Sequence, residues 1–181
     1  ATIDVEGAGY APEGALRLDG QVLGEGELAR RVPAALALAE AAALCNDASL
    51  VERDGQWQLA GDPTEGALLT LALKAGLNPA ELKIERPRLE IIPFESEHRY
   101  MATLHAAGDA SVALVKGAPE RILAMCSTQL GPDGSTQPLD HGRWTAQIEV
   151  QARAGRRVLA LARRAWAAGK EDLHHADVAG G

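Results

Sequence analysis

The stretch that decides the fold is SVALVKGAPE, residues 111–120. Its first half is an apolar run typical of a buried strand, and Lys116 stands at the end of that run. Gly117 follows, and a residue without a Cβ lets a ligand come close to the backbone. Pro119 fits the first turn of a helix, where its missing N–H is not needed. We therefore expect a strand–glycine–helix junction, with one cation at the strand end, over which a flat or anionic ligand could lie.

Further elements are predicted on both sides of this junction. Three extended segments are predicted, at 88–94, 99–106 and 110–116, and the last of them contains the apolar run. A turn at 107–109 joins the last two. A helix should follow Pro119, and a loop is expected at 131–134. Towards the end of the chain the pattern predicts a helix over 139–154 and a buried strand over 157–162.

The first half of the chain shows helical and hairpin signals. Apolar spacing predicts a helix over 27–45, with Pro33 in its first turns or bending it. Asp54-Gly55 predicts a hairpin turn. Asp62, Pro63 and Glu65 form a capping-box arrangement that opens a helix to about residue 75. Residues 78–88 are expected to be a connector.

These elements predict an α+β fold, with helices flanking a twisted, mainly antiparallel sheet. The length of 181 residues favours one domain, which we place at 1–169. Residues 170–181 are polar and end in Gly-Gly, so a tail or a cut linker is expected there. The His174-His175 pair in this segment is a weak metal signal, and we interpret it as solvated, with no metal site predicted.

Composition excludes several classes of protein. The net charge of −7 argues against a nucleic-acid surface, although a small anion needs only a local positive spot. The longest apolar stretch, 33–45, contains Glu40 and is shorter than the ~20 residues of a membrane span. Cys45 and Cys126 have no metal-ligand spacing, so buried reduced thiols are expected.

Candidate binding residues can be weighed one by one. Phe94 is the only phenylalanine and is followed by five polar or charged residues, so its ring could stack on a base or simply end a core strand. Arg99 could face a phosphate or lie in solvent. Glu65 is already explained by the capping box, and Arg157 is ambiguous. No nucleophile–base set is present, so the chain is predicted to bind rather than to catalyse.

Five motifs occur together and in order: CNDA at 45–48, GDPTEGAL at 61–68, PFESxxRxM at 93–101, KGAPE at 116–120 and RVLALA at 157–162. In this combination the chain resembles the nucleotide-binding (N) domain of P-type cation-transporting ATPases. The resemblance is to the branch that contains calcium and sodium/potassium pumps, and to its bacterial members. The resemblance covers nearly the whole chain, from a strand expected at residues 2–5 to about Trp166.

The resemblance implies a role for each matching residue. Phe94 corresponds to the aromatic that stacks on adenine, and Lys116 to the lysine lining that site. The other positions that the resemblance implies are Gly117 and Ala118 as the floor, Glu65 near the adenine amino group, Arg99 and Arg157 towards the phosphates, and Leu159 beneath the base. Ser96 stands where calcium pumps have an arginine, which implies weaker phosphate contact.

The resemblance also implies what the chain does. The phosphorylated aspartate motif and the magnesium-binding aspartates of the family are missing, so the chain is expected to bind ATP without useful hydrolysis. The implied parent is an ATP-driven cation translocase that is integral to a membrane, with this domain on the cytoplasmic face, and there ATP would act with magnesium. The implied partners are ATP and the phosphorylation and actuator domains, with no nucleic acid and no direct membrane contact.

Two alternatives accompany this interpretation. The first is a non-catalytic α+β interaction module that keeps the scaffold without a nucleotide site. The second is another branch of the family. A heavy-metal transporter is disfavoured because its N domain carries a His-Pro pair that is not found here, and a proton pump fits residues 93–101 less well. The transported ion is not predicted, because ion sites lie in membrane helices.

Overall fold

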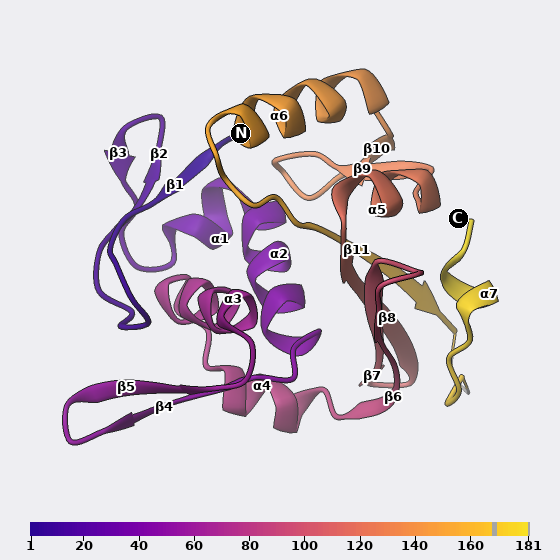
Figure 1. Ribbon diagram of the computed structural model, residues 1–181, viewed down its shortest axis with the longest axis horizontal. Coiled ribbons are helices and arrows are strands. Elements are labelled where there is room, and N and C mark those ends of the chain that lie inside the picture. The colour runs from indigo at the N-terminus through magenta and orange to yellow at the C-terminus, as the bar shows by residue number, and fades with distance from the viewer. Residues whose placement is uncertain (168–169, 181) are drawn as a thin grey trace. The chain divides into compact units, whose positions relative to one another are not determined.

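The computed structural model describes residues 1–167 and 170–180 (Figure 1). Its contacts divide the chain into two compact units. The first unit contains residues 1–85 and 131–135, and the second contains residues 86–130 and the chain from Thr136 onward. Together they confirm the α+β class, with antiparallel sheets and flanking helices.

The second unit is built on a four-stranded antiparallel sheet (Figure 1). Its strands, in spatial order, are β11 (Ala160–Trp166), β8 (Ala110–Gly117), β7 (Tyr100–Ala107) and β6 (Arg88–Glu95). The three predicted extended segments are thus confirmed. The last strand was predicted at 157–162 but begins at Ala160, and it is an edge strand with exposed residues rather than a buried one.

One face of this sheet carries the main core of the unit. Tyr100, Ala102 and Leu104 of β7 share this face with Ala113 and Val115 of β8. Helix α5 (Pro119–Met125) covers it with Ile122 and Met125. The helix predicted after Pro119 is therefore present, and it begins with the proline at its N-terminus.

The end of the chain also packs on this face. Leu173 and Val178, the latter in the short helix α7 (His175–Val178), belong to the same core cluster. The segment expected to be a polar tail therefore holds two buried apolar side chains. Burying them offsets the entropy lost when the segment is ordered.

A bulge interrupts the pairing of β6 with β7. Ile92 pairs with Ala102 and Glu95 pairs with Tyr100, so Pro93 and Phe94 together oppose Met101. Such a bulge inserts one extra residue and changes the direction in which side chains point.

The rest of the second unit is a small hairpin and one helix. Strands β9 (Thr128–Leu130) and β10 (Thr136–Pro138) flank the loop predicted at 131–134, and neither strand was predicted. Helix α6 (His141–Arg153) confirms the helix expected over 139–154. The Asp140 side chain caps it by accepting from the Arg143 N–H.

In the first unit, the helix predicted over 27–45 is two helices, α1 (Glu27–Arg31) and α2 (Pro33–Leu44). The chain breaks at Val32, which has φ −142° and ψ 65°. A residue before proline is sterically disfavoured in the helical region, so α1 ends there. Leu28 and Val32 pack with Leu16 and Leu18 of a three-stranded sheet formed by β1 (Ile3–Val5), β2 (Leu16–Leu18) and β3 (Gln21–Val22).

Two further predictions for this unit are confirmed. Strands β4 (Ser49–Arg53) and β5 (Gln56–Ala60) form the hairpin, and Asp54 and Gly55 at its turn have φ 51° and 74°. Positive φ at both turn residues is the geometry that Asp-Gly favours. Helix α3 (Pro63–Lys74) begins after Asp62, whose carboxylate accepts from the Thr64 and Glu65 N–H groups.

The connector expected over 78–88 is partly helical. Helix α4 (Pro79–Glu85) begins after Asn78, whose side-chain oxygen accepts from the Ala80 N–H, and it buries Leu82. Pro79 therefore starts a helix instead of marking a loop.

Across residues 1–167 and 170–180, no helix is both long enough and apolar enough to cross a membrane.

Candidate functional site

The strand–glycine–helix junction brings β7 and β8 unusually close. Gly117 pairs with Tyr100, and a Cβ on Gly117 would lie 2.4 Å from the carbonyl oxygen of Arg99. The next residue, Ala118, precedes α5 and donates its N–H to that same oxygen at 2.9 Å. Position 117 therefore requires glycine because the backbone of β7 already occupies the place of a Cβ. The sequence did not reveal this reason.

Lys116 lies on the sheet face opposite the α5-covered core. It pairs with Met101 of β7 and with Leu161 of β11, whereas the core residues alternate with these three. Lys116 is 7% exposed. The predicted cation is thus at the end of the strand, as expected, and it is largely buried.

Phe94 lies on the same face of the sheet as Lys116. The residue after it, Glu95, pairs with Tyr100 on the core face, so Phe94 points to the opposite face, on which Met101 and Lys116 lie. One strand separates Phe94 from Lys116, which places their backbones about 10 Å apart. Phe94 is 61% exposed, so it is not a core residue.

This arrangement depends on the bulge in β6. Without the extra residue, simple alternation from Ile92 would place Phe94 on the core face. The bulge instead turns an exposed aromatic ring to the side of the buried lysine. A bulge of this kind has no clear sequence signal, although a proline within the strand, Pro93, is consistent with one.

Arg99 occupies the turn between β6 and β7 with φ 58°, a left-handed backbone conformation. Its Nη1 atom lies 2.6 Å from the Oε1 atom of Glu120, the acidic residue of the KGAPE motif. Both side chains are more than half exposed. The predicted phosphate-facing cation is thus paired with a carboxylate, which sequence reasoning did not anticipate because the two residues are 21 positions apart.

Arg157 and Leu159 lie in the segment that leads into β11. The first residue of β11, Ala160, pairs with Gly117, so this segment reaches the sheet at the junction that ends β8. Arg157 is exposed and Leu159 is half-buried.

Glu65 belongs to the first unit, whereas the other seven predicted residues belong to the second. Its Oε2 atom accepts from the backbone N–H groups of Asp47 and Ala48, each at 3.1 Å. Asn46 donates its side-chain amide to the Glu65 carbonyl oxygen at 3.0 Å. The CNDA and GDPTEGAL motifs are therefore held together by hydrogen bonds, a link that their joint occurrence in the sequence could have suggested.

The buried Tyr100 supports the junction from the core face. It is 1% exposed, and burial raises the pKa of its phenol, an effect that the nearby Arg121 guanidinium opposes. The hydroxyl therefore stays protonated at neutral pH.

Comparison with known proteins places this chain in a family. Residues 35–178 match the model of the P-type ATPase cytoplasmic domain N, which is the nucleotide-binding region of these pumps. The chain is 47% identical over 133 residues to a probable cation-transporting ATPase F of Mycobacterium tuberculosis, covering 74% of this chain and 15% of that protein.

Further relatives carry similar names. A cation-transporting ATPase, pma1, of Synechocystis is 40% identical over 179 residues, which is 97% of this chain and 19% of that protein. A calcium-transporting ATPase of Bacillus subtilis is 36% identical over 132 residues, which is 72% of this chain and 14% of that protein. The chain therefore spans less than a fifth of the length of each of these relatives.

Proposed function

The chain belongs to the family of the P-type ATPase cytoplasmic domain N, and on that premise we propose that it binds ATP by the adenine base. The observation that carries the proposal is the exposed ring of Phe94 on the same sheet face as Lys116. An aromatic face stacks on a purine, and an ammonium group beside it supplies a hydrogen-bond donor and a positive charge.

The neighbouring residues have assigned roles in this proposal. Gly117 and Ala118 form the floor of the base site next to Lys116, and Leu159 contacts the base from the segment before β11. Arg99 and Arg157 point towards the phosphates, with Arg99 exchanging Glu120 for a phosphate oxygen when ATP binds. Ser96, in place of an arginine, keeps phosphate contact weak.

Glu65 is assigned to the adenine amino group only through the family resemblance. Its carboxylate already accepts two backbone N–H groups, and a carboxylate has further lone pairs that could accept from an amine.

In the parent pump, we propose that the domain presents ATP, together with Mg²⁺, to an aspartate in a separate phosphorylation domain. The energy of that transfer would drive cation transport, as the names of the relatives suggest. The bound Mg²⁺ would neutralise charge on the phosphates, and no residue of this chain is assigned to it. The present chain would bind nucleotide without useful hydrolysis.

An NMR titration with ATP tests the proposal. In ¹⁵N-labelled protein, amide shifts are expected at Phe94 and Gly117, with a Kd on the order of 0.1–1 mM. Phe94→Ala should weaken binding about 5- to 150-fold, because base stacking contributes ~1–3 kcal/mol. Phe94→Tyr keeps an aromatic face and should bind nearly as well as the wild type.

A matched control comes from Trp144, another exposed aromatic residue of the same unit. Trp144→Ala should leave ATP affinity unchanged. If Phe94→Ala bound ATP as tightly as the wild type, the stacking role would be wrong. If the wild type gave no shifts at several millimolar ATP, the alternative of an interaction module without a nucleotide site would be favoured.

A further inference from the structure

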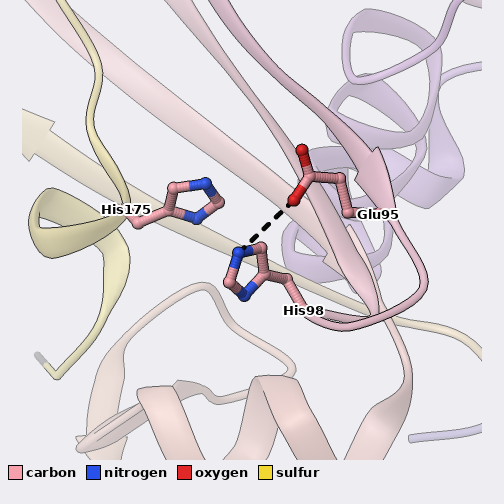
Figure 2. Close-up of side chains that lie close together, drawn as sticks. All are labelled: Glu95, His98 and His175. Carbon is pink, nitrogen blue, oxygen red and sulfur yellow. Dashed lines mark ion pairs between the residues drawn. The ribbon is translucent and has the colours of Figure 1, made fainter.

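Three potential metal ligands meet at the edge of the sheet, on the face opposite Phe94 and Lys116. Glu95 ends β6, His98 lies in the turn that follows, and His175 begins α7, almost eighty positions along the chain (Figure 2). Each side chain offers one ligand atom, and these atoms all lie within 4.8 Å of one another. Figure 2 shows the three side chains pointing towards a common centre.

One of the distances between these atoms matches the spacing of ligands around a zinc ion. Zn–N and Zn–O bonds of ~2.0–2.2 Å in a tetrahedron separate neighbouring ligand atoms by about 3.3–3.6 Å. His98 Nε2 lies 3.4 Å from Glu95 Oε2, so one edge of the tetrahedron is already formed. His98 and His175 have ring centroids 4.2 Å apart, and the remaining edges, each no longer than 4.8 Å, would shorten when an ion binds.

The backbone that carries these ligands is held in place from several directions. Glu95 pairs with Tyr100 across the strands, and the Tyr100 hydroxyl lies 2.6 Å from Nδ1 of His175. A hydrogen bond to one ring nitrogen is what normally orients a ligating histidine and selects its tautomer. Val178 anchors α7 in the core, so His175 is presented from an ordered element.

The ligand types select the class of ion. Two imidazoles and one carboxylate suit zinc and neighbouring transition metals, whereas magnesium and calcium prefer oxygen ligands alone. Three protein ligands also leave a fourth position for water. We propose that Glu95, His98 and His175 form a binding site for a divalent transition-metal ion of the zinc class.

Such a site would link α7 to the β6–β7 turn through the bound ion. The ion would join His175 of α7 to two ligands only three residues apart, and so close a long loop. The proposal does not depend on ATP binding, because Glu95 and the Phe94–Lys116 pair lie on opposite faces of the sheet.

Calorimetric titration of the metal-stripped 181-residue chain with Zn²⁺ tests the site. One ion per chain is expected, and Mg²⁺ should give no heat of binding. His98→Ala and His175→Ala should each weaken Zn²⁺ binding by more than the roughly 10–100-fold typical of losing an outer-shell partner. Glu95→Gln should weaken it as well.

Two histidine controls separate this cluster from ordinary surface imidazoles. His141→Ala removes an exposed histidine from the same unit. His174→Asn removes the neighbour of His175 and replaces the residue that precedes α7 with a good helix cap. Both variants should bind Zn²⁺ as the wild type does. If His174→Asn weakened binding as much as His98→Ala, the ion would belong to the terminal histidine pair and the proposal would be overturned.

A measurement on the wild type keeps the test valid if a variant fails to fold. Imidazole ¹⁵N resonances of His98 and His175 should shift on addition of one equivalent of Zn²⁺, while those of His105 and His141 stay in place. No saturable binding, or shifts that leave out His98, would overturn the proposal.

Discussion

Gly117 and Tyr100 are cross-strand partners, and a Cβ on Gly117 would lie 2.7 Å from the Cβ of Tyr100. Contacts this short do not occur between relaxed side chains, so β7 and β8 would have to separate. Gly117→Ala should therefore lower the free energy of unfolding by about 1–3 kcal/mol, the usual cost of overpacking. Urea denaturation measures the change.

Gly142 provides the control for this prediction. It lies near the start of α6, where an added Cβ would meet only Asp140 Oδ1, at 3.7 Å. Gly142→Ala should leave stability unchanged or raise it, because alanine is the better helix former. An equal loss in both variants would show that the contact with Tyr100 is not the cause.

Glu65 connects two motifs by accepting the N–H groups of Asp47 and Ala48. Glu65→Ala removes this acceptor, and losing hydrogen bonds to a charged group should cost about 1–3 kcal/mol. Thermal denaturation should show a lower Tm. Glu149→Ala, which breaks an exposed pair with Arg153, should change stability by less than ~0.5 kcal/mol. Equal effects would contradict the structural role of Glu65.

The exposed pair of Arg99 and Glu120 leads to a prediction about nucleotide affinity. If Arg99 exchanges Glu120 for a phosphate, Glu120→Gln should tighten ATP binding by up to about 5-fold, because exposed pairs contribute ~0–1 kcal/mol. Adenosine affinity should not change, since adenosine has no phosphate. Fluorescence or NMR titrations with both ligands measure the difference.

The control for this charge effect is Glu97→Gln, which removes the same charge from the turn and leaves the Arg99–Glu120 pair in place. A gain in affinity for both variants alike would point to general repulsion instead of exchange at Arg99.

Asp133 gives a prediction about pH. The hydroxyl and N–H of Ser135 donate to its carboxylate and hold the pKa of Asp133 below its ordinary value. A carboxyl whose pKa is depressed by folding stabilises the loop above its unfolded pKa. That contribution is lost as the pH falls through the depressed pKa.

Carboxyl ¹³C NMR checks this effect. Ser135→Ala should raise the pKa of Asp133 towards its ordinary value, whereas Ser135→Thr keeps a hydroxyl and should preserve the low pKa. If Ser135→Ala left the pKa unchanged, the Ser135 hydroxyl would not be its main cause.

Local signals in the sequence predicted most elements of the fold. The Asp54-Gly55 hairpin, the Asp62-capped helix and the sequential strands β6 to β8 were all found, because turn chemistry, capping and apolar runs act over a few residues. The break at Val32 and helix α4 were missed. In both cases a proline marked a helix start that was interpreted as a bend or a loop.

In the candidate site, too, some features could be predicted from the sequence and others could not. Residue types and motif order were enough to identify the family, because each motif is contiguous in the chain, and they name Phe94 and Lys116 as candidates. The Arg99–Glu120 pair, the contact of Gly117 with Tyr100 and the cluster of Glu95 and His98 with His175 were not foreseen. Each joins residues far apart in the chain, and their distances depend on strand register and packing.

Family membership and local structure thus followed from the order of amino acids alone. Each family motif is contiguous, and short-range sterics, capping and hydrophobic periodicity are properties of neighbouring residues. The sheet face on which each candidate side chain lies did not follow from the sequence. A single extra residue in β6 turns Phe94 to the side of Lys116 and leaves Glu95 beside His98 on the other. Long-range pairing sets that register, because a shift of one residue exchanges the two faces of a strand.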